Sequence, residues 1–204
     1  MKIEYTTFSE IGKRRANQDV CRVVEMPKYN RTLMIVCDGM GGHSMGDVAA
    51  ETVCNAICEF WGNNPDVPDS ETKVADACKA ALEALYARSR VVRPIEMGTT
   101  MVMASVEGNI LTIAHCGDSR CYLLRDRAVV YQTQDHADPH WGSEVVTRCF
   151  FSMNPKVLCP KSHASKYSQE TEFSCVAMVY IKQWHRKLLP QGCRMKCHWR
   201  RSWM

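Results

Sequence analysis

Residues 33–47 read Leu-Met-Ile-Val-Cys-Asp-Gly-Met-Gly-Gly-His-Ser-Met-Gly-Asp. The apolar run 33–37 predicts a buried strand, and the Asp-Gly that follows it predicts a turn. Glycines crowd the rest of the stretch, and glycine lets another group approach the main chain closely. We therefore expect Asp38 at the end of a rigid strand, where carboxylate and carbonyl oxygens can hold a hard cation. The alternative is a strand followed by an ordinary flexible turn.

The composition indicates a soluble, globular domain of ordinary size. The chain has 204 residues, of which 46% are hydrophobic and 24% are charged. No run approaches the roughly 20 apolar residues of a membrane-spanning helix, and residues 1–10 contain no apolar segment typical of a secretory signal. Most of the twelve cysteines lie inside apolar runs. We therefore expect reduced thiols, a cytoplasmic location and no membrane partner.

Charge is distributed unevenly along the chain. The net charge is +4, but residues 156–204 contain ten Lys or Arg and only two Glu. The preceding residues therefore hold 16 basic and 20 acidic side chains. The end of the chain differs in character from the rest.

Strand and helix signals follow an order typical of an α+β protein. Two helices are expected at about 47–61 and 70–90, with Asp47 and Ser70 as their N-caps. Because strand signals joined by short turns precede and follow them, we expect helices packed on antiparallel sheets rather than alternating βαβ units. The strands are expected at 2–8, 20–26, 33–37, 100–106, 110–115, 121–124 and 128–132.

Four short motifs occur in sequence. They are Arg14 with Asn17-Gln18-Asp19, then Asp38-Gly39-Met40-Gly41-Gly42-His43, then Gly98-Thr99-Thr100, and then Gly117-Asp118-Ser119-Arg120. In order and spacing they resemble the metal-dependent protein phosphatases, the protein phosphatase 2C-like family, in its bacterial form. The resemblance covers about residues 3–157. It implies a phosphatase domain over residues 1–157, built as a β-sandwich of two antiparallel sheets flanked by helices.

The resemblance also implies a role for individual residues. Asp38 would bridge two Mg²⁺ or Mn²⁺ ions, the Gly39 carbonyl would ligate one of them, and Asp19 would support the cluster. Asp118 would bind a third, weaker ion, and Arg14 would clamp the substrate phosphate with its guanidinium fork. Two such ions about 4 Å apart can lower the pKa of a bridging water.

The activity implied is hydrolysis of phosphoserine and phosphothreonine in phosphorylated proteins, the products of a serine/threonine kinase. The family resemblance favours a monomer that requires neither nucleic acid nor membrane. Without the resemblance, the polar loop around Arg14 and Asp19 would be interpreted as solvated surface.

The chain departs from the family pattern in two places. Met40 stands where eukaryotic members carry a His, as it does in bacterial members, and His43 is left without a role. After Asp138 the chain contains no Asp, although the family uses a late Asp-Gly and a final Asp-Asn as metal ligands. The sandwich is therefore expected to be incomplete at its C-terminal end. A catalytically impaired fragment, or a pseudophosphatase that binds phosphoproteins, remains the alternative function.

The genetic code offers an explanation for the missing carboxylates. When Gln169 to Val179 are back-translated and read from the third base of each codon, permitted codons give Gly-Asp-Arg-Ile-Leu-Leu-Cys-Ser-Asp-Gly. The final Gly is forced, because Met178 has a single codon and all Val codons begin alike. We interpret residues 158–204 as an out-of-frame tail that begins near Val157–Pro160. The alternative is a genuine divergent tail with its own role.

The tail also contains Cys193, Cys197 and His198, followed by a basic segment with Trp199. The spacing is not that of a zinc site with paired Cys-x-x-Cys ligands. Under the out-of-frame interpretation we predict neither zinc nor nucleic-acid binding by this segment.

Overall fold

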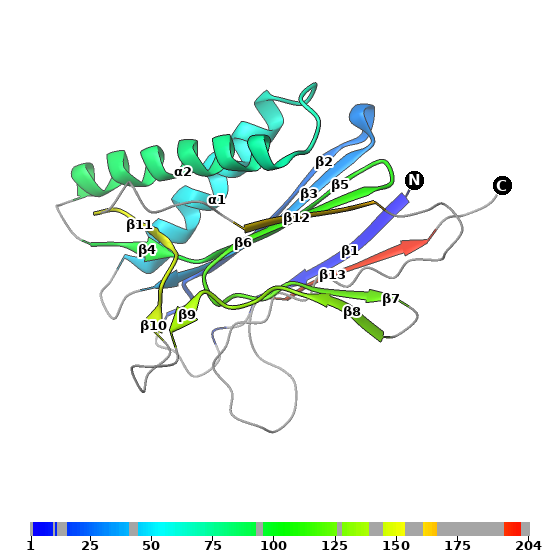
Figure 1. Cartoon of the computed structure of the whole chain (residues 1–204). Coiled ribbons are helices and arrows are strands. Elements are labelled where there is room, and N and C mark those ends of the chain that lie inside the picture. The colour runs from blue at the N-terminus through cyan, green and yellow to red at the C-terminus, as the bar shows by residue number, and fades with distance from the viewer. Residues whose placement is uncertain are drawn as a thin grey trace.

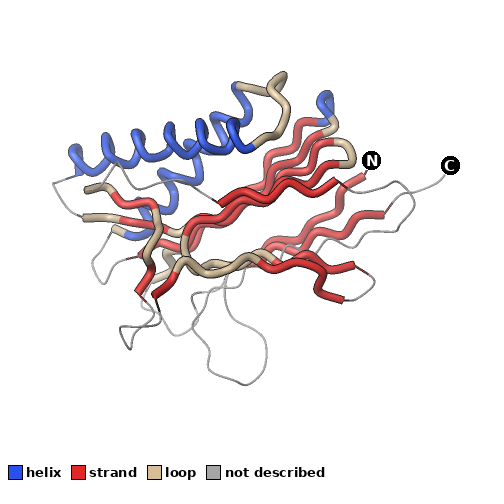
Figure 2. Tube along the Cα trace, in the orientation of Figure 1, coloured by secondary structure: helices blue, strands red, loops and turns tan. Residues whose placement is uncertain are grey.

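The computed structural model describes residues 2–9, 11, 16–40, 45–92, 96–125, 128–138, 145–153, 161–166 and 194–200. Two layers of strands lie beneath a layer of two helices (Figures 1 and 2). All strand pairs within the described residues are antiparallel. The predicted α+β sandwich is confirmed.

The helices are α1 (Gly46–Asn63) and α2 (Glu71–Val92), and a 3₁₀ turn spans Pro27–Tyr29. The strands are β1 (Lys2–Phe8), β2 (Asp19–Met26), β3 (Arg31–Met40), β4 (Gly98–Thr99), β5 (Met101–Glu107), β6 (Ile110–Cys116), β7 (Tyr122–Arg125), β8 (Ala128–Gln132), β9 (Ala137–Asp138), β10 (Val145–Val146), β11 (Phe150–Phe151), β12 (Lys161–Lys166) and β13 (Arg194–Arg200).

The first sheet is built around β3. Its strands lie in the order β11-β4-β3-β5-β6-β12, and β2 also pairs with β3. Residues 33–37 are almost inaccessible to solvent, because helices cover one face of β3 and the second layer of strands covers the other. Burial on both faces explains why this segment is a continuous apolar run rather than an alternating one.

The second layer contains the pairs β1–β13 and β7–β8, and β9 pairs with β10 near one end. Strands β12 and β13 come from residues 158–204, where the sequence shows only weak periodicity. β12 pairs with β6 from Ile110 to His115, and β13 pairs with β1 along its length. Two parts of this basic segment therefore lie within the sheets.

The two helices begin in different ways. At α2, the Ser70 hydroxyl accepts a hydrogen bond from the Lys73 N–H at 3.1 Å, as predicted for a cap. At α1, Asp47 is not the N-cap, which corrects the sequence prediction. The helix begins at Gly46, and its N-cap Met45 makes no side-chain capping bond. Asp47 instead lies in the first turn, where its negative charge interacts favourably with the positive end of the helix dipole.

Alternate residues of β3 face two separate cores. Leu33, Ile35 and Cys37 pack against the helices, whereas Met34 and Val36 pack toward the second layer of strands. The apolar stripe predicted for α2 is buried in the first of these cores. Its members are Val74, Ala77, Ala81, Leu82 and Leu85.

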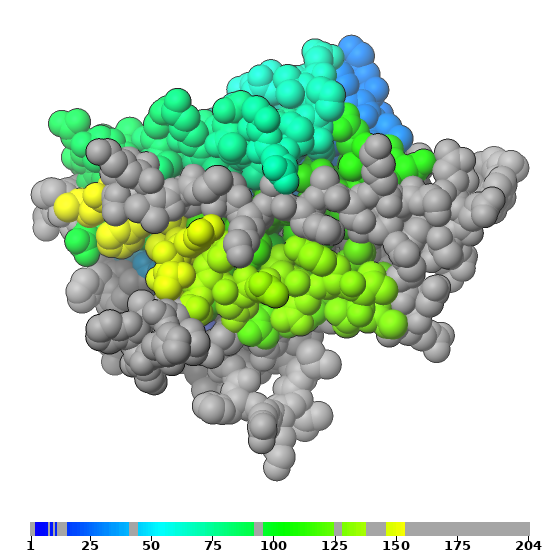
Figure 3. Space-filling model, in the orientation of Figure 1, coloured from blue at the N-terminus to red at the C-terminus, as the bar shows by residue number. Residues whose placement is uncertain are grey.

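The outer surface follows this layering. In the space-filling view α2 forms the upper surface, and residues of β7 and β8 lie below it (Figure 3). Neither helix of the described chain has the length and apolar character needed to cross a membrane.

Candidate functional site

Two carboxylates lie at one end of the apolar core between the two layers of strands. Asp19 on β2 and Asp38 on β3 are direct partners in the antiparallel register, so their side chains project from the same face of the sheet. On each strand they lie on the same face as apolar residues that pack toward the second layer, which are Cys21 and Val23 on β2 and Met34 and Val36 on β3. Directly opposed residues have Cβ atoms about 4.5–5.5 Å apart. A pair of half-buried carboxylates therefore lies at one end of the interface between the two layers of strands.

The main chain at Asp38 is held by two buried threonines. Both the Thr100 N–H and the Thr99 hydroxyl donate to the Asp38 carbonyl oxygen, each at 2.9 Å. The Asp38 N–H donates in turn to the Thr100 hydroxyl at 3.2 Å. The N–H and the carbonyl of Asp38 are therefore both hydrogen-bonded, which fixes the backbone that carries the carboxylate.

The segment before β2 supports the same end of the sheet. The Asn17 side-chain oxygen accepts a hydrogen bond from the Asp19 N–H at 3.0 Å, and the Asn17 amide donates to Ser9 at 2.6 Å. The Gln18 carbonyl accepts a hydrogen bond from the Gly39 N–H at 3.1 Å. The Asn-Gln-Asp motif therefore ties β2 to the residue that follows Asp38.

Glycine at position 39 allows α1 to begin against β3. A Cβ atom at Gly39 would lie 2.2 Å from the carbonyl oxygen of Gly46, the first residue of α1. That contact is with backbone and has no room to relax. The close approach brings the N-terminus of α1 next to the residue that follows Asp38.

We predict that Gly39→Ala lowers the free energy of unfolding by about 1–3 kcal/mol, because α1 must move away from β3. Urea unfolding measures the change. The matched control is Gly62→Ala in α1, where a Cβ atom meets nothing within 4 Å. This second variant is expected to stabilise the helix by about 0.5–1 kcal/mol. Equal effects of the two substitutions would contradict the packing argument.

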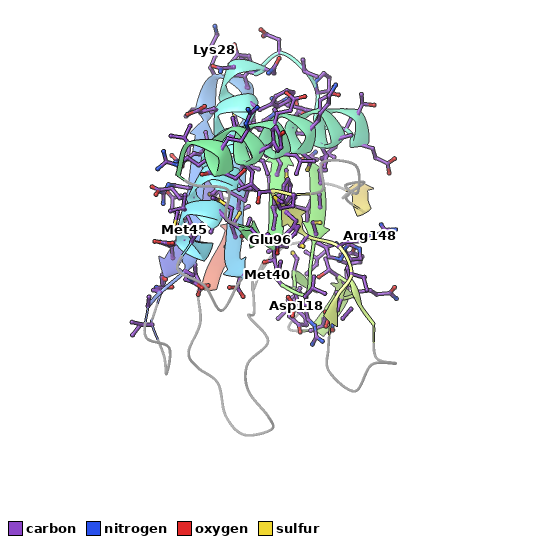
Figure 4. All side chains as sticks on the ribbon, turned by 90° about the vertical axis from the view of Figure 1, so that its left-hand side faces the viewer. Lys28, Met40, Met45, Glu96, Asp118 and Arg148 are labelled. Carbon is purple, nitrogen blue, oxygen red and sulfur yellow. The ribbon has the colours of Figure 1, made fainter. Side chains whose placement is uncertain are left out.

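Asp118 lies in the loop after β6, at the same end of the molecule. Figure 4 looks onto this end and shows Asp118 facing the viewer together with Met40, the last residue of β3. Burial and, to a smaller extent, the Asp118 carboxylate raise the pKa of the Cys149 thiol to about 11. Asp118 therefore lies near the segment that leads into β11.

Asp118 does not form one cluster with the Asp19–Asp38 pair. Within the described ranges, no group of three carboxylate, imidazole or thiol side chains is arranged to hold a metal ion. The site thus offers two adjacent carboxylates and a third on a neighbouring loop. An oxygen-only donor set of this kind fits Mg²⁺ or Mn²⁺ better than a softer metal.

The loop that carries Asp118 is fixed on its far side by His136. The Gly117 N–H donates to the ring Nδ1 of His136 at 3.3 Å, and the backbone N–H of His136 donates to the Gly117 carbonyl at 2.9 Å. The His136 ring stacks on that of His115, with ring centroids 4.4 Å apart. Sequence reasoning missed both histidines, because neither belongs to one of the four motifs.

Arg120, the last residue of the Gly-Asp-Ser-Arg motif, has a structural partner. Its guanidinium binds both carboxylate oxygens of Asp135, at 2.6 and 2.7 Å. These hydrogen bonds raise the pKa of Arg120. The pair therefore joins the start of β7 to the segment that precedes β9.

Two residues of the sequence hypothesis fall outside the described residues. Arg14, the predicted phosphate clamp, lies in 12–15, and His43 lies in 41–44. The assignment of Arg14 stays a prediction.

A family model described as protein phosphatase 2C matches residues 9–179. Similar curated proteins are the serine/threonine protein phosphatase PstP of Mycobacterium tuberculosis, 34% identical over 65% of this chain and 25% of its own length, and the serine/threonine phosphatase stp of Listeria monocytogenes, 36% identical over 62% and 52%. The chain thus spans between a quarter and about half of the length of these curated relatives.

Solved structures agree with the sequence matches. The catalytic domain of the serine/threonine protein phosphatase PstP, in complex with two manganese ions, superposes with a TM-score of 0.66 at 26% identity, covering 81% of this chain and 73% of that one. Stp1 from Staphylococcus aureus gives 0.68 at 25% identity, covering 81% and 72%. Together with the four motifs and the two-layered sandwich, these matches show that the chain belongs to the protein phosphatase 2C family.

Proposed function

We propose that this protein hydrolyses phosphoserine and phosphothreonine in proteins, with a water activated by divalent cations. The observation that carries the proposal is the pair Asp19 and Asp38, which are direct partners in the register of β2 and β3. Two carboxylates that project side by side supply the oxygen ligands that Mg²⁺ and Mn²⁺ prefer. The names of the curated relatives support serine and threonine as the phosphorylated residues.

The residues have distinct roles in this proposal. Asp38 would hold both cations, Asp19 and the Gly39 carbonyl would support or ligate them, and Asp118 would hold a further, weaker cation. Arg14 binds and orients the substrate phosphate. The cations, Mg²⁺ or Mn²⁺, would supply an acidic water and neutralise charge on the phosphoryl oxygens. The manganese ions named for the PstP structure support this choice.

The substrates we propose are proteins phosphorylated by a serine/threonine kinase. We further propose that the protein acts as a monomer in the cytoplasm. The burial of Cys37, Cys54 and Cys116 supports their role as small apolar core residues rather than as disulfide partners.

We also propose that residues 158–204 are translated out of frame, which accounts for the absence of Asp after Asp138. The basic charge of this segment and the Asp-Gly recovered in the other frame support this origin. A genuine divergent tail is the competing explanation. It is favoured by the family match up to residue 179 and by the pairing of β12 and β13.

Restoring one base near codon 158 separates these explanations and tests the activity. We expect the restored protein to release phosphate from a phosphothreonine peptide in Mn²⁺ and to stop in EDTA. The chain as written should be at least about 100-fold slower, because a metal ligand is missing and ligand number sets cation affinity.

The two forms give separable outcomes. If neither form has Mn²⁺-dependent activity, the proposed phosphatase function is wrong. If both forms are equally active, the function stands and the out-of-frame origin of the tail is wrong.

A further inference from the structure

Thr100 lies at the point where the edge of β3 passes from one partner strand to the next. β5 pairs with β3 as far as Val36, and β4 pairs with it at Gly39 and Met40. Thr100 separates β4 from β5, and its side chain is completely buried. It accepts from the Asp38 N–H through its hydroxyl and donates to the Asp38 carbonyl through its own N–H.

The same hydroxyl continues to the Asp118 loop. The Thr100 and Ser119 side-chain oxygens are 2.6 Å apart, and both residues are buried. A threonine hydroxyl has one proton and two lone pairs. Since the Thr100 oxygen accepts from Asp38, it can donate its proton to Ser119. One buried hydroxyl therefore lies between the backbone of Asp38 and the residue after Asp118.

Close packing reinforces this connection. Gly117, with a φ of +116°, approaches Thr100 so closely that a Cβ atom there would lie 2.6 Å from the threonine methyl group. On its other side Gly117 makes two hydrogen bonds to His136, one to the ring Nδ1 and one from the backbone N–H. The Asp118 loop is thus held between Thr100 and His136.

We propose that Thr100 is a positioning residue that couples the Asp38 carboxylate to the Asp118 carboxylate, so that cation binding at one site strengthens binding at the other. The inference rests on the proposed function, because it concerns the cations that these carboxylates would hold. Its chemical basis is a shared partner: a buried chain of hydrogen bonds is cooperative, and removing one member loosens both neighbours. Partners that orient metal ligands are typically worth 10–100-fold in metal affinity.

The test compares Thr100→Val, which keeps the shape and removes the hydroxyl, with Thr100→Ser, which keeps the hydroxyl. The probe is Mn²⁺ alone, titrated by calorimetry and by the rise in Tm relative to EDTA. We expect Thr100→Val and Ser119→Ala each to raise the Mn²⁺ concentration for half-saturation about 10–100-fold. Thr100→Ser should stay close to the unaltered protein.

The double variant of Thr100→Val and Ser119→Ala measures the coupling itself. If both hydroxyls act through one bond, the double variant should bind Mn²⁺ no more weakly than the weaker single variant. In EDTA, amide hydrogen exchange at Asp38 should accelerate in Thr100→Val, because its N–H loses its acceptor. This readout requires no metal and no activity.

Thr112→Val is the matched control. Thr112 is as buried as Thr100, and its hydroxyl has no hydrogen-bond partner within the described residues. The control should leave Mn²⁺ affinity unchanged.

Two outcomes would overturn the inference in different ways. If the unaltered protein binds Mn²⁺ and Thr100→Val binds it equally well, the coupling is wrong and the proposed function stands. If neither the unaltered protein nor the frame-restored protein binds Mn²⁺, both are wrong.

Discussion

Replacing Asp38 with Asn in the frame-restored protein is expected to lower Mn²⁺-dependent turnover of a phosphothreonine peptide by at least about 10²–10³-fold. Asparagine keeps the size of the side chain, and the backbone bonds to Thr99 and Thr100 do not involve the carboxylate. A neutral amide, however, cannot hold two divalent cations. The measurement is phosphate release over a Mn²⁺ series that reaches saturation.

The same variant should fold well, which separates the loss of activity from a loss of structure. The substitution leaves the bonds of the Asp38 main chain to Thr99 and Thr100 in place. In EDTA we therefore expect Asp38→Asn to be nearly as stable as the unaltered protein. The same substitution in the chain as written offers a second readout. Mn²⁺ should raise the Tm of the unaltered chain but not that of its Asp38→Asn variant.

Asp66→Asn is the control for this experiment. Asp66 is exposed and lies in the connection between α1 and α2, away from the Asp19–Asp38 pair. The same chemical change there should leave turnover and Mn²⁺ affinity unaltered. Full activity of Asp38→Asn at saturating Mn²⁺ would show that this carboxylate does not hold the catalytic cations.

The sequence predicts the strands and helices well because their signals are local. The β5–β6 hairpin follows from two apolar runs joined by Gly108, which has a positive φ of 58°, and the α2 stripe follows from helical spacing. The prediction that Asp47 is the N-cap is wrong because the start of α1 depends on a contact between Gly39 and Gly46. That contact joins a strand to a helix and leaves no periodic signal.

The candidate site is predictable only in part for the same reason. The alternation of β2 and β3 is sufficient to put Asp19 and Asp38 on one face once their register is known. The bonds from Thr100 to Asp38 and Ser119 join residues far apart in the chain. A motif can draw attention to Thr100, but only the fold reveals which partners its hydroxyl reaches.

A buried charge cluster is the feature that the sequence reveals least. Asp69, in the connection between α1 and α2, pairs with Arg31 and with Lys73, each at 3.2 Å, and also binds the Ser105 hydroxyl. Arg31 pairs as well with Glu107. These residues come from β3, the α1–α2 connection, α2 and β5, and each one alone resembles an ordinary surface residue.

The cluster fastens the helix pair to the first sheet. Arg31 on β3 donates to the carbonyls of Pro65 and Val67 at 2.8 and 3.0 Å. Lys73 on α2 donates to Val67 at 2.8 Å and lies 4.7 Å from the centre of the Trp61 ring. Burial lowers the pKa of Lys73, and the charge of Asp69 opposes that shift.

Asp69→Asn is therefore expected to lower the free energy of unfolding by about 3–5 kcal/mol, because it leaves Arg31 and Lys73 buried with one carboxylate fewer. Urea unfolding in EDTA measures the loss. Asp66→Asn, three positions earlier and exposed, should change stability by less than about 0.5 kcal/mol. A similarly small effect of Asp69→Asn would mean that the cluster does not stabilise the fold.

The α1–α2 connection lies at the end of the first sheet away from β4 and the Asp118 loop (Figure 1). The fraction of Asp69→Asn that remains folded should accordingly bind Mn²⁺ as the unaltered protein does, whereas Asp38→Asn should lose Mn²⁺ binding without losing stability.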